Sequence, residues 1–289
     1  MKTPTISPEA RRSARAAAGF TLVELLVVIA IIGVLAGMLM PVLVRAKVKA
    51  QVVMAKTQMQ QIVTAVAGYE SAYSRLPVSS NALYAASAAN EDFTYGTAGL
   101  TTPPVAGKSF IRDQALGGVA ASIAANDASG NALGYQANNS EVMAILMDRE
   151  TYPLNGNYTV NQGHVKNPQK NSFLNAAVVS DQFSPGVGSD LVYRDPWGDP
   201  YLISFDLNND DKTWDSFHRT SAHTAQGTGN AGLAGLIANP PTGVAAANSS
   251  YFSWSGHVMI WSAGPDKQIN SNAKSNVGAN KDNVLSWMQ

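Results

Sequence analysis

The sequence predicts an α+β protein: a long N-terminal α-helix, part transmembrane and part exposed, packed against a small antiparallel β-sheet with long loops. Three observations predict it. Residues 20–44 form an apolar run of 25 residues with one charged residue, Glu24. Apolar residues then recur at helical spacing as far as residue 73. Short runs of β-forming residues, bounded by turn residues, follow in the second half of the chain.

Charge and composition limit the classes of partner. The 289 residues carry no net charge, but residues 1–75 hold nine Lys and Arg against three acidic residues, whereas residues 76–289 hold eleven against seventeen. An acidic second part without a basic cluster argues against nucleic acid as a partner. Because the chain has no cysteine, a disulfide framework and thiol chemistry are excluded.

The run at 20–44 is long enough to cross a bilayer, whose apolar core needs about 20 helical residues. A secretory signal peptide fits poorly, because its apolar core has about 7–15 residues and its cleavage site follows that core. Here the polar boundary at Gly19 precedes the run. A simple signal anchor fits the length but explains neither Gly19 nor Glu24. A carboxylate costs about 2.5–3.5 kcal/mol at the bilayer centre, less near its edge, and normally marks a function.

A basic leader, the Gly19-Phe20 junction and an apolar helix with Glu24 five residues past the glycine resemble the type IV pilin and type II secretion pseudopilin family. The resemblance implies that a prepilin peptidase removes residues 1–19 and methylates the new amino terminus on Phe20. It also implies that Glu24 neutralises the Phe20 ammonium of a neighbouring subunit, since opposite charges in low dielectric cost less together than apart.

Orientation in the membrane follows from this resemblance, because Arg45, Lys47 and Lys49 after the span offset the basic leader in the charge count. The resemblance implies a single-pass protein of the inner (cytoplasmic) membrane with a periplasmic globular domain, or a fibre subunit in the periplasm or at the cell surface. The implied partners are other pilin-like subunits in a homo- or hetero-polymer, prepilin peptidase, an inner-membrane assembly platform, and membrane lipid before assembly.

The helix is expected to run over residues 20–75, with its membrane-spanning part at 20–44. Pro77 ends it, because the residue before a proline avoids helical geometry. Pro41 removes one helical hydrogen bond, and the resemblance implies that the helix loosens there on packing. Gly33 and Gly37 form a small-xxx-small pattern that lets helices approach, although glycine and proline are also simply common in membrane helices. The apolar stripe of the exposed half comprises Val48, Val52, Ala55, Met59, Ile62, Val63, Val66 and Tyr73.

Residues 76–289 are expected to form the globular domain, with insertions at about 76–189 and 207–255. No element is predicted within 76–139. Ser140 caps a short helix at 141–147 with Val142, Ile145 and Leu146 facing inward. A turn is predicted at 184–188, strands at 191–193, 201–205 and 257–261, and a hairpin turn at 195–200 between the first two strands. Residues 220–250 are predicted to be a loop or a variable insertion.

Three C-terminal segments resemble the major pseudopilin of type II secretion: RDPWGDPY at 194–201, SAGPD at 262–266, and DNVLSW at 282–287. In that family the loop that closes the fold binds calcium. Carried over residue by residue, the resemblance implies calcium ligands at Asp266, Asp282 and Asn283. The family usually has two adjacent acids where this chain has Asp282-Asn283, and calcium also accepts amide oxygens.

A second oxygen-rich cluster has the spacing of the first three ligands of an EF-hand loop: Asp206, Asn208 and Asp210. An EF-hand is excluded, because Asp211 replaces the turn glycine and Phe217 stands where the bidentate glutamate belongs. Two interpretations stay open. The segment is an irregular calcium loop closed by Asp211 or Asp215, or a solvated turn whose side chains hold their own backbone.

Enzyme signatures are poor. GTGNAG at 227–232 matches a dinucleotide fingerprint by letter but follows no predicted strand. His218 and His223 lack the spacing of a zinc protease, and His164 and His257 are isolated in the sequence. Trp197, Trp261 and Trp287 are expected to pack in the core. The chain is therefore predicted to be no enzyme but a structural subunit of a pilus-like fibre. The alternative is a low-copy tip or adhesive subunit whose inserted loops contact cargo, a surface or a nucleic acid.

Overall fold

The computed structural model describes residues 20–89, 92–96, 137–226, 229–238, 252–270 and 273–288. The predicted leader lies outside these residues. The chain divides into two compact units, Met1–Lys47 and Val48–Gln289, and each is described by itself. The described elements are α1 (Leu22–Tyr73), α2 (Ser80–Ala89), β1 (Phe93–Tyr95), α3 (Ser140–Leu146), η1 (Gln162–His164), β2 (Gly186–Val187), β3 (Tyr193–Arg194), β4 (Leu202–Phe205), β5 (Lys212–Thr213), α4 (Ser221–Thr224), η2 (Leu233–Gly235), β6 (Ile237–Ala238), β7 (Phe252–Ser255), β8 (Val258–Ser262), η4 (Gly278–Asn280) and β9 (Val284–Leu285).

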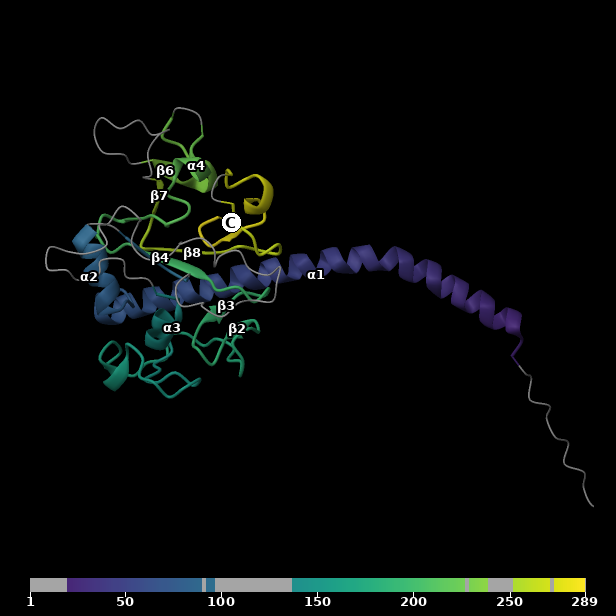
Figure 1. The fold of residues 1–289 in the computed structure, drawn as a ribbon, viewed down its shortest axis with the longest axis horizontal. Helices are drawn as coiled ribbons and strands as arrows, with labels where there is room; N and C mark the ends of the chain where they lie inside the picture. Colours follow the sequence, from purple (N-terminus) through teal and green to yellow (C-terminus); the bar gives the residue numbers. More distant parts are fainter. Residues whose placement is uncertain are drawn as a thin grey trace, which may run out of the picture. The chain divides into compact units, whose positions relative to one another are not determined.

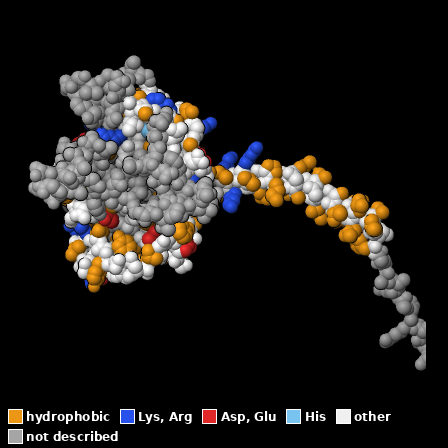
Figure 2. Space-filling view, viewed as in Figure 1, with side chains coloured by type: hydrophobic (Ala, Val, Ile, Leu, Met, Phe, Trp, Pro, Cys, Tyr) orange, Lys and Arg blue, Asp and Glu red, His pale blue; other side chains and the backbone are white. Residues whose placement is uncertain are grey.

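Helix α1 confirms the long N-terminal helix and continues through Pro41. In the first unit every described residue, 20–47, is exposed. Its best 18-residue window has a mean hydropathy of 2.8, so by length and composition α1 is long and apolar enough to cross a membrane. Figure 2 shows hydrophobic side chains along this segment and Lys and Arg side chains after it.

The part of α1 in the second unit buries half of the predicted stripe, Ala55, Met59, Ile62 and Val66, whereas Val48, Val52, Val63 and Tyr73 are only partly buried. Its fully buried positions are Ala55, Met59, Ile62, Ala65, Val66 and Tyr69. They share one core with Ile203 and Phe205 of β4 and with Ile260 of β8, and Figure 1 shows these strands alongside this half of the helix. Burying a side chain such as Met59 or Ile62 contributes about 1.5–3 kcal/mol. The predicted packing of helix on sheet is therefore confirmed.

The main sheet has four antiparallel strands in the order β1-β4-β8-β9. In register, Phe93 pairs with Phe205 and Leu202 with Trp261. Strands β4 and β8 confirm the predictions at 201–205 and 257–261 to within one residue. No element was predicted within 76–139, and the structure adds α2 and the edge strand β1 there. Strand β1 has only three residues, all buried, so no apolar–polar alternation marks it.

The predicted hairpin between 191–193 and 201–205 forms only next to its turn, where Tyr201 N donates to Tyr193 O at 3.1 Å. Strand β3 also pairs with β2, which occupies the predicted turn at 184–188. The turn at 195–200 does form, with a hydrogen bond from Asp195 N to Asp199 O of 2.8 Å and a bridge between Arg194 and Pro200. Beyond it, β4 pairs with β1 and β8 instead. Leu191 has a φ of +58° and therefore does not extend β3.

Helix α3 confirms the helix predicted at 141–147, but its cap was assigned wrongly. Asn139 is the N-cap residue and Ser140 is the first helical residue. The Asn139 amide donates to Tyr193 O and Tyr201 O and accepts from Tyr193 N, so it links the helix to β3 and the start of β4. All seven residues of α3 are buried, so the predicted inward face is the whole helix.

The predicted insertion at 207–255 builds a second antiparallel sheet in the order β5-β7-β6, and the predicted loop at 220–250 holds α4, η2 and β6. Thr213 pairs with Trp254, and Ala238 pairs with Phe252. The strands are two to four residues long and separated by Gly- and Ala-rich sequence, which hid them from pattern reading. Residues 227–228 and 239–251 of this region lie outside the described part of the chain.

Candidate functional site

The predicted assembly residues lie at the start of α1. Glu24 Oε2 accepts hydrogen bonds from Thr21 N and Thr21 Oγ1, both at 2.8 Å, and Glu24 N donates to Thr21 Oγ1 at 3.2 Å. This reciprocal arrangement is a capping box, which satisfies two backbone donors that a helix start leaves free. The sequence T-L-V-E at 21–24 carried that signal. Glu24 therefore has a local role besides the one implied by the resemblance.

Further along the span, the surface of α1 is open at the glycines. A Cβ atom added at Gly33 or Gly37 would meet no atom within 4 Å. Pro41 lies inside a helix that continues on both sides. A close approach of another helix at the glycines and a loosening at Pro41 stay predictions.

The segment 194–201 ties the second unit together. Asp195 is fully buried and accepts from Trp197 N, from Asp199 N and, at 2.5 Å, from Ser262 Oγ. Burial, opposed by the Ser262 hydrogen bond, raises the pKa of Asp195 to about 7. Gln51 of α1 donates to Pro196 O at 3.1 Å. This segment thus acts as a structural turn that joins α1 to the strand β8.

The closing loop brings Asp266 and Asp282 together. Asp266 N donates to Asp282 Oδ2 at 3.2 Å. Gly264 has a φ of +78°, and a Cβ there would collide with the Asp282 carbonyl oxygen, which explains the glycine. Burial, and then the charge of Asp266, raises the pKa of Asp282. Both amide atoms of Asn283 are buried without a hydrogen-bond partner among the described residues. Two crowded carboxylates beside an unsatisfied amide are groups that a calcium ion could neutralise and bind.

The second cluster has the hydrogen bonds of a turn. Asp206 accepts from Asn209 N and Asp211 N, Asn208 accepts from Asp210 N, and Asp210 accepts from Lys212 N. These bonds are the ones expected for side chains that hold their own backbone. Calcium on the Asp206, Asn208 and Asp210 set stays a prediction.

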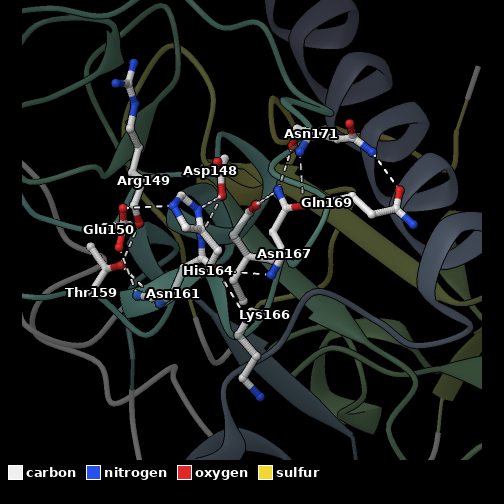
Figure 3. Close-up of polar contacts among 12 residues, drawn as sticks. Asp148, Arg149, Glu150, Thr159, Asn161, His164, Lys166, Asn167, Gln169 and Asn171 are labelled. Carbon is white, nitrogen blue, oxygen red and sulfur yellow. Dashed lines mark hydrogen bonds and ion pairs between the residues drawn. The ribbon is translucent and has the colours of Figure 1, made fainter.

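Two histidines, His164 and His257, have carboxylate partners that sequence reading missed. His257 Nδ1 lies 2.9 Å from Glu70 Oε1, and its Nε2 lies 3.2 Å from Asp211 Oδ1. The Asp211 hydrogen bond and the nearby Glu70 raise the pKa of His257. His164 likewise contacts Asp148 at 2.8 Å and Glu150 at 2.9 Å, as Figure 3 shows.

A cavity of about 570 Å3 lies in the second unit, lined by Val52, His218, Asn280, Asn283 and Leu285 among others. His218 is fully buried, and neither of its ring nitrogens has a hydrogen-bond partner among the described residues. Burial lowers the pKa of His218 to about 4.

Two of the three tryptophans that were predicted to pack in the core, Trp261 and Trp287, surround His218. The imidazole packs edge-on against Trp261 and Trp287. Trp261 is fully buried, whereas Trp197 and Trp287 are partly buried against core clusters.

Comparison with known proteins identifies the N-terminal segment. Residues 14–40 match the family model described as the prokaryotic N-terminal methylation motif. No curated protein and no solved structure matches the chain. The motif supports a pilin-like subunit processed by a prepilin peptidase, and it indicates a family of structural subunits rather than enzymes. Together with the apolar helix it indicates a single-pass membrane anchor. The match ends before the globular part, so the C-terminal similarity to the major pseudopilin stays a prediction.

Proposed function

We propose that this chain is a pseudopilin-like structural subunit that is cut after Gly19 and polymerises through α1 into a type II secretion pseudopilus or a type IV pilus-like fibre. The observation that carries the proposal is the change along α1. Its first part, residues 22–47, buries nothing within the chain, whereas residues 55–69 hold the globular core. So much apolar surface requires a cover from outside the chain.

Lipid of the inner membrane is the cover before assembly, and the helices of neighbouring subunits replace it in the fibre. The globular domain then lies in the periplasm, where an assembly platform in the membrane receives the subunit. Gly33 and Gly37 suit this exchange, because a helix surface without side chains lets another backbone approach. The carboxylate of Glu24 would receive the Phe20 ammonium of the next subunit.

The processing test is direct. We expect the mature protein to begin with N-methylated Phe20, as measured by N-terminal sequencing and intact mass of the membrane form. Gly19→Asp should block the cut, since the peptidase must fit the backbone closely at that junction, whereas the small side chain of Gly19→Ala should allow it. Recovery of an intact Met1, or of a start beyond Val44, contradicts the proposal.

A second candidate is a low-copy tip or binding subunit. The 570 Å3 cavity favours it, because His218 and Asn283 both line it and the polar side-chain atoms of both lack a hydrogen-bond partner within the described part of the chain. Mass spectrometry of sheared fibres separates the two candidates. A structural subunit that builds the fibre should be the most abundant protein in the fibres, whereas a tip subunit should be present at a few copies per fibre.

We also propose that the closing loop holds calcium through Asp266, Asp282 and Asn283. The support is the mutual crowding of the two carboxylates and the unsatisfied amide beside them. The ion would neutralise both acids and fix the C-terminal residues, which already reach α1 through Gln60 Nε2 and Ser286 O at 3.0 Å.

A further inference from the structure

Four side chains from three distant segments meet in the second unit. Glu70 comes from the last turn of α1, Asp206 and Asp211 from the connection between β4 and β5, and His257 from the turn between β7 and β8. Within the part of the chain that the structure describes, Asp206, Asp211 and His257 are the one group of His, Asp or Glu residues whose ligand atoms all lie within 4.8 Å of one another.

The geometry at the imidazole is that of a metal-binding histidine. Two ligands about 2.0–2.2 Å from a tetrahedral zinc ion lie about 3.4 Å apart, close to the 3.2 Å between His257 Nε2 and Asp211 Oδ1. The other ring nitrogen, Nδ1, lies 2.9 Å from Glu70 Oε1. A carboxylate on the far nitrogen fixes the tautomer and the ring orientation of a zinc-bound imidazole.

The charges also call for a cation. Asp206 is buried, and each of its oxygens accepts from a backbone amide, which leaves further lone pairs for a metal. Among the described residues, the structure shows no Lys or Arg in an ion pair with Asp206 or Asp211. Within that described part, His257 is thus the one basic side chain in an ion pair with either aspartate, although Arg75 and Lys166 line the cavity at this site.

The donor set selects the class of metal. Calcium prefers six to eight oxygen ligands, whereas zinc accepts an imidazole nitrogen with carboxylate oxygens in a four-coordinate site. A cavity of about 310 Å3, lined by all four of these residues and by Arg75, gives an ion access to the site.

We propose that Asp206, Asp211 and His257 bind a zinc-type divalent metal ion, with Glu70 as the carboxylate that orients the imidazole. The ion would connect the end of α1 with the two sheets that β4, β5, β7 and β8 enter. This site shares Asp206 with the calcium set predicted from spacing, and Asp211 with the residues that could close that loop, and it does not depend on the proposed function.

The chain supplies its own control. His164 has the same pair of contacts as His257, with one ring nitrogen 2.8 Å from Asp148 and the other 2.9 Å from Glu150, but no further carboxylate takes the place of Asp206 there among the described residues. Figure 3 shows His164 lying between them. These residues form no group of three convergent ligand atoms, so they should not bind the ion.

The test uses the full chain in detergent micelles, without a histidine tag and freed of metal by chelator. Calorimetric titration with zinc chloride should show one ion per chain and a raised melting temperature. His257→Gln and Asp211→Asn should lose the binding. Glu70→Gln should weaken it about 10–100-fold, the usual effect of removing such an orienting carboxylate. His164→Gln and Asp210→Asn should bind as the wild type does.

Circular dichroism of each metal-free variant shows whether it folds. If His257→Gln does not fold, the Glu70→Gln titration decides. The proposal is overturned if the folded wild type binds no zinc, if Glu70→Gln or folded His257→Gln binds zinc with wild-type affinity, or if binding depends on His164 or Asp210.

Discussion

Residues 22–47 and residues 48–73 lie on the same continuous helix, yet every side chain of the first half is exposed and six of the second half are buried. The first half is apolar on all sides and the second only along one stripe. A helix that is apolar all round needs an apolar surrounding, whereas a striped helix needs a single partner surface. The partner of the second half is the sheet of this chain, and we propose that the first half finds its partner in lipid and then in other subunits.

We expect the largest effect from a substitution in the first half of the helix, at Glu24, where fibre assembly should be lost. Glu24→Ala should enter the membrane at least as well as the wild type, because an apolar side chain replaces a charge. It should assemble poorly, since the Phe20 ammonium loses its partner. The yield of sheared fibres, with cleavage checked by mass, measures this.

Glu24→Gln separates the two roles of this side chain. Glutamine still closes a capping box with Thr21 but carries no charge. If charge pairing drives assembly, Glu24→Gln should fail as Glu24→Ala does, while Thr21→Val with Glu24 intact should still form fibres. A wild-type fibre yield from Glu24→Gln would show that Glu24 acts only as a helix cap and not through its charge.

In the second half of α1, substitutions of buried side chains should change the stability of the globular domain instead. In a chain that begins at residue 45, Met59→Ala should lower the free energy of unfolding by about 2–5 kcal/mol, because it leaves a cavity in the core. The matched control Met54→Ala, at a position 53% exposed on the same helix, should change it by less than about 0.5 kcal/mol. Denaturant unfolding measures both. Equal effects at the two positions would contradict the assigned buried face.

The same contrast explains what could be predicted from the sequence. The membrane span could be predicted from composition, and the buried side of the helix from the spacing of its apolar residues. Both ends of α1 were therefore predicted to within two residues. Strand β1 and the sheet β5-β7-β6 were missed, because their strands have two to four residues and their pairing partners are distant in sequence.

The sites divide in the same way. Glu24 was found because a charge stands out in an apolar run. The meeting of Glu70 with His257 was not, since 187 positions separate them and no local pattern joins them. Ser140 was predicted as the cap of α3, but the N-cap residue is Asn139. Its side chain makes no capping hydrogen bond and instead bonds Tyr193 and Tyr201, a contact that only the folded chain creates.

A pH dependence should appear in the globular unit. The pKa of Asp195 is about 7 in the folded protein, against about 3.9 in an unfolded chain. Between these two values the folded protein keeps a proton that the unfolded chain releases. The free energy of unfolding should therefore fall as pH rises from about 4 to about 7 and then level off, with a contribution of about 1–4 kcal/mol.

Asp195→Asn should remove that contribution, which is measured as the difference between wild type and variant in denaturant unfolding at several pH values. The difference is needed because Asp92, whose pKa burial also raises to about 7, acts in the same window. Ser262→Ala should move the transition to higher pH, because the Ser262 hydrogen bond lowers the pKa of Asp195. If the free energy of unfolding of Asp195→Asn falls with pH as steeply as that of the wild type, Asp195 does not titrate between about pH 4 and about pH 7.

The smallest expected effect is that of calcium on the closing loop. In the chain that begins at residue 45, millimolar calcium should raise the melting temperature and chelator should lower it again. An ion that binds only the folded state contributes about 2.7 kcal/mol at a hundredfold excess over its Kd. Asp282→Ala should abolish the gain, and Asp210→Ala should leave it. If Asp210→Ala abolishes it instead, the calcium lies in the turn at 206–211.

Asn283→Asp makes this test more specific, because it gives the chain the two adjacent acids that are usual in the family that it resembles. Without calcium the new carboxylate should lower the melting temperature, since it adds a third charge beside Asp266 and Asp282 in a partly buried loop. With calcium the shift should exceed that of the wild type, because ligand charge raises the affinity for the ion. The two shifts have opposite signs, so a turn without metal cannot produce both. A melting temperature that ignores calcium and chelator in both proteins would leave Asp266, Asp282 and Asn283 as the residues of a turn.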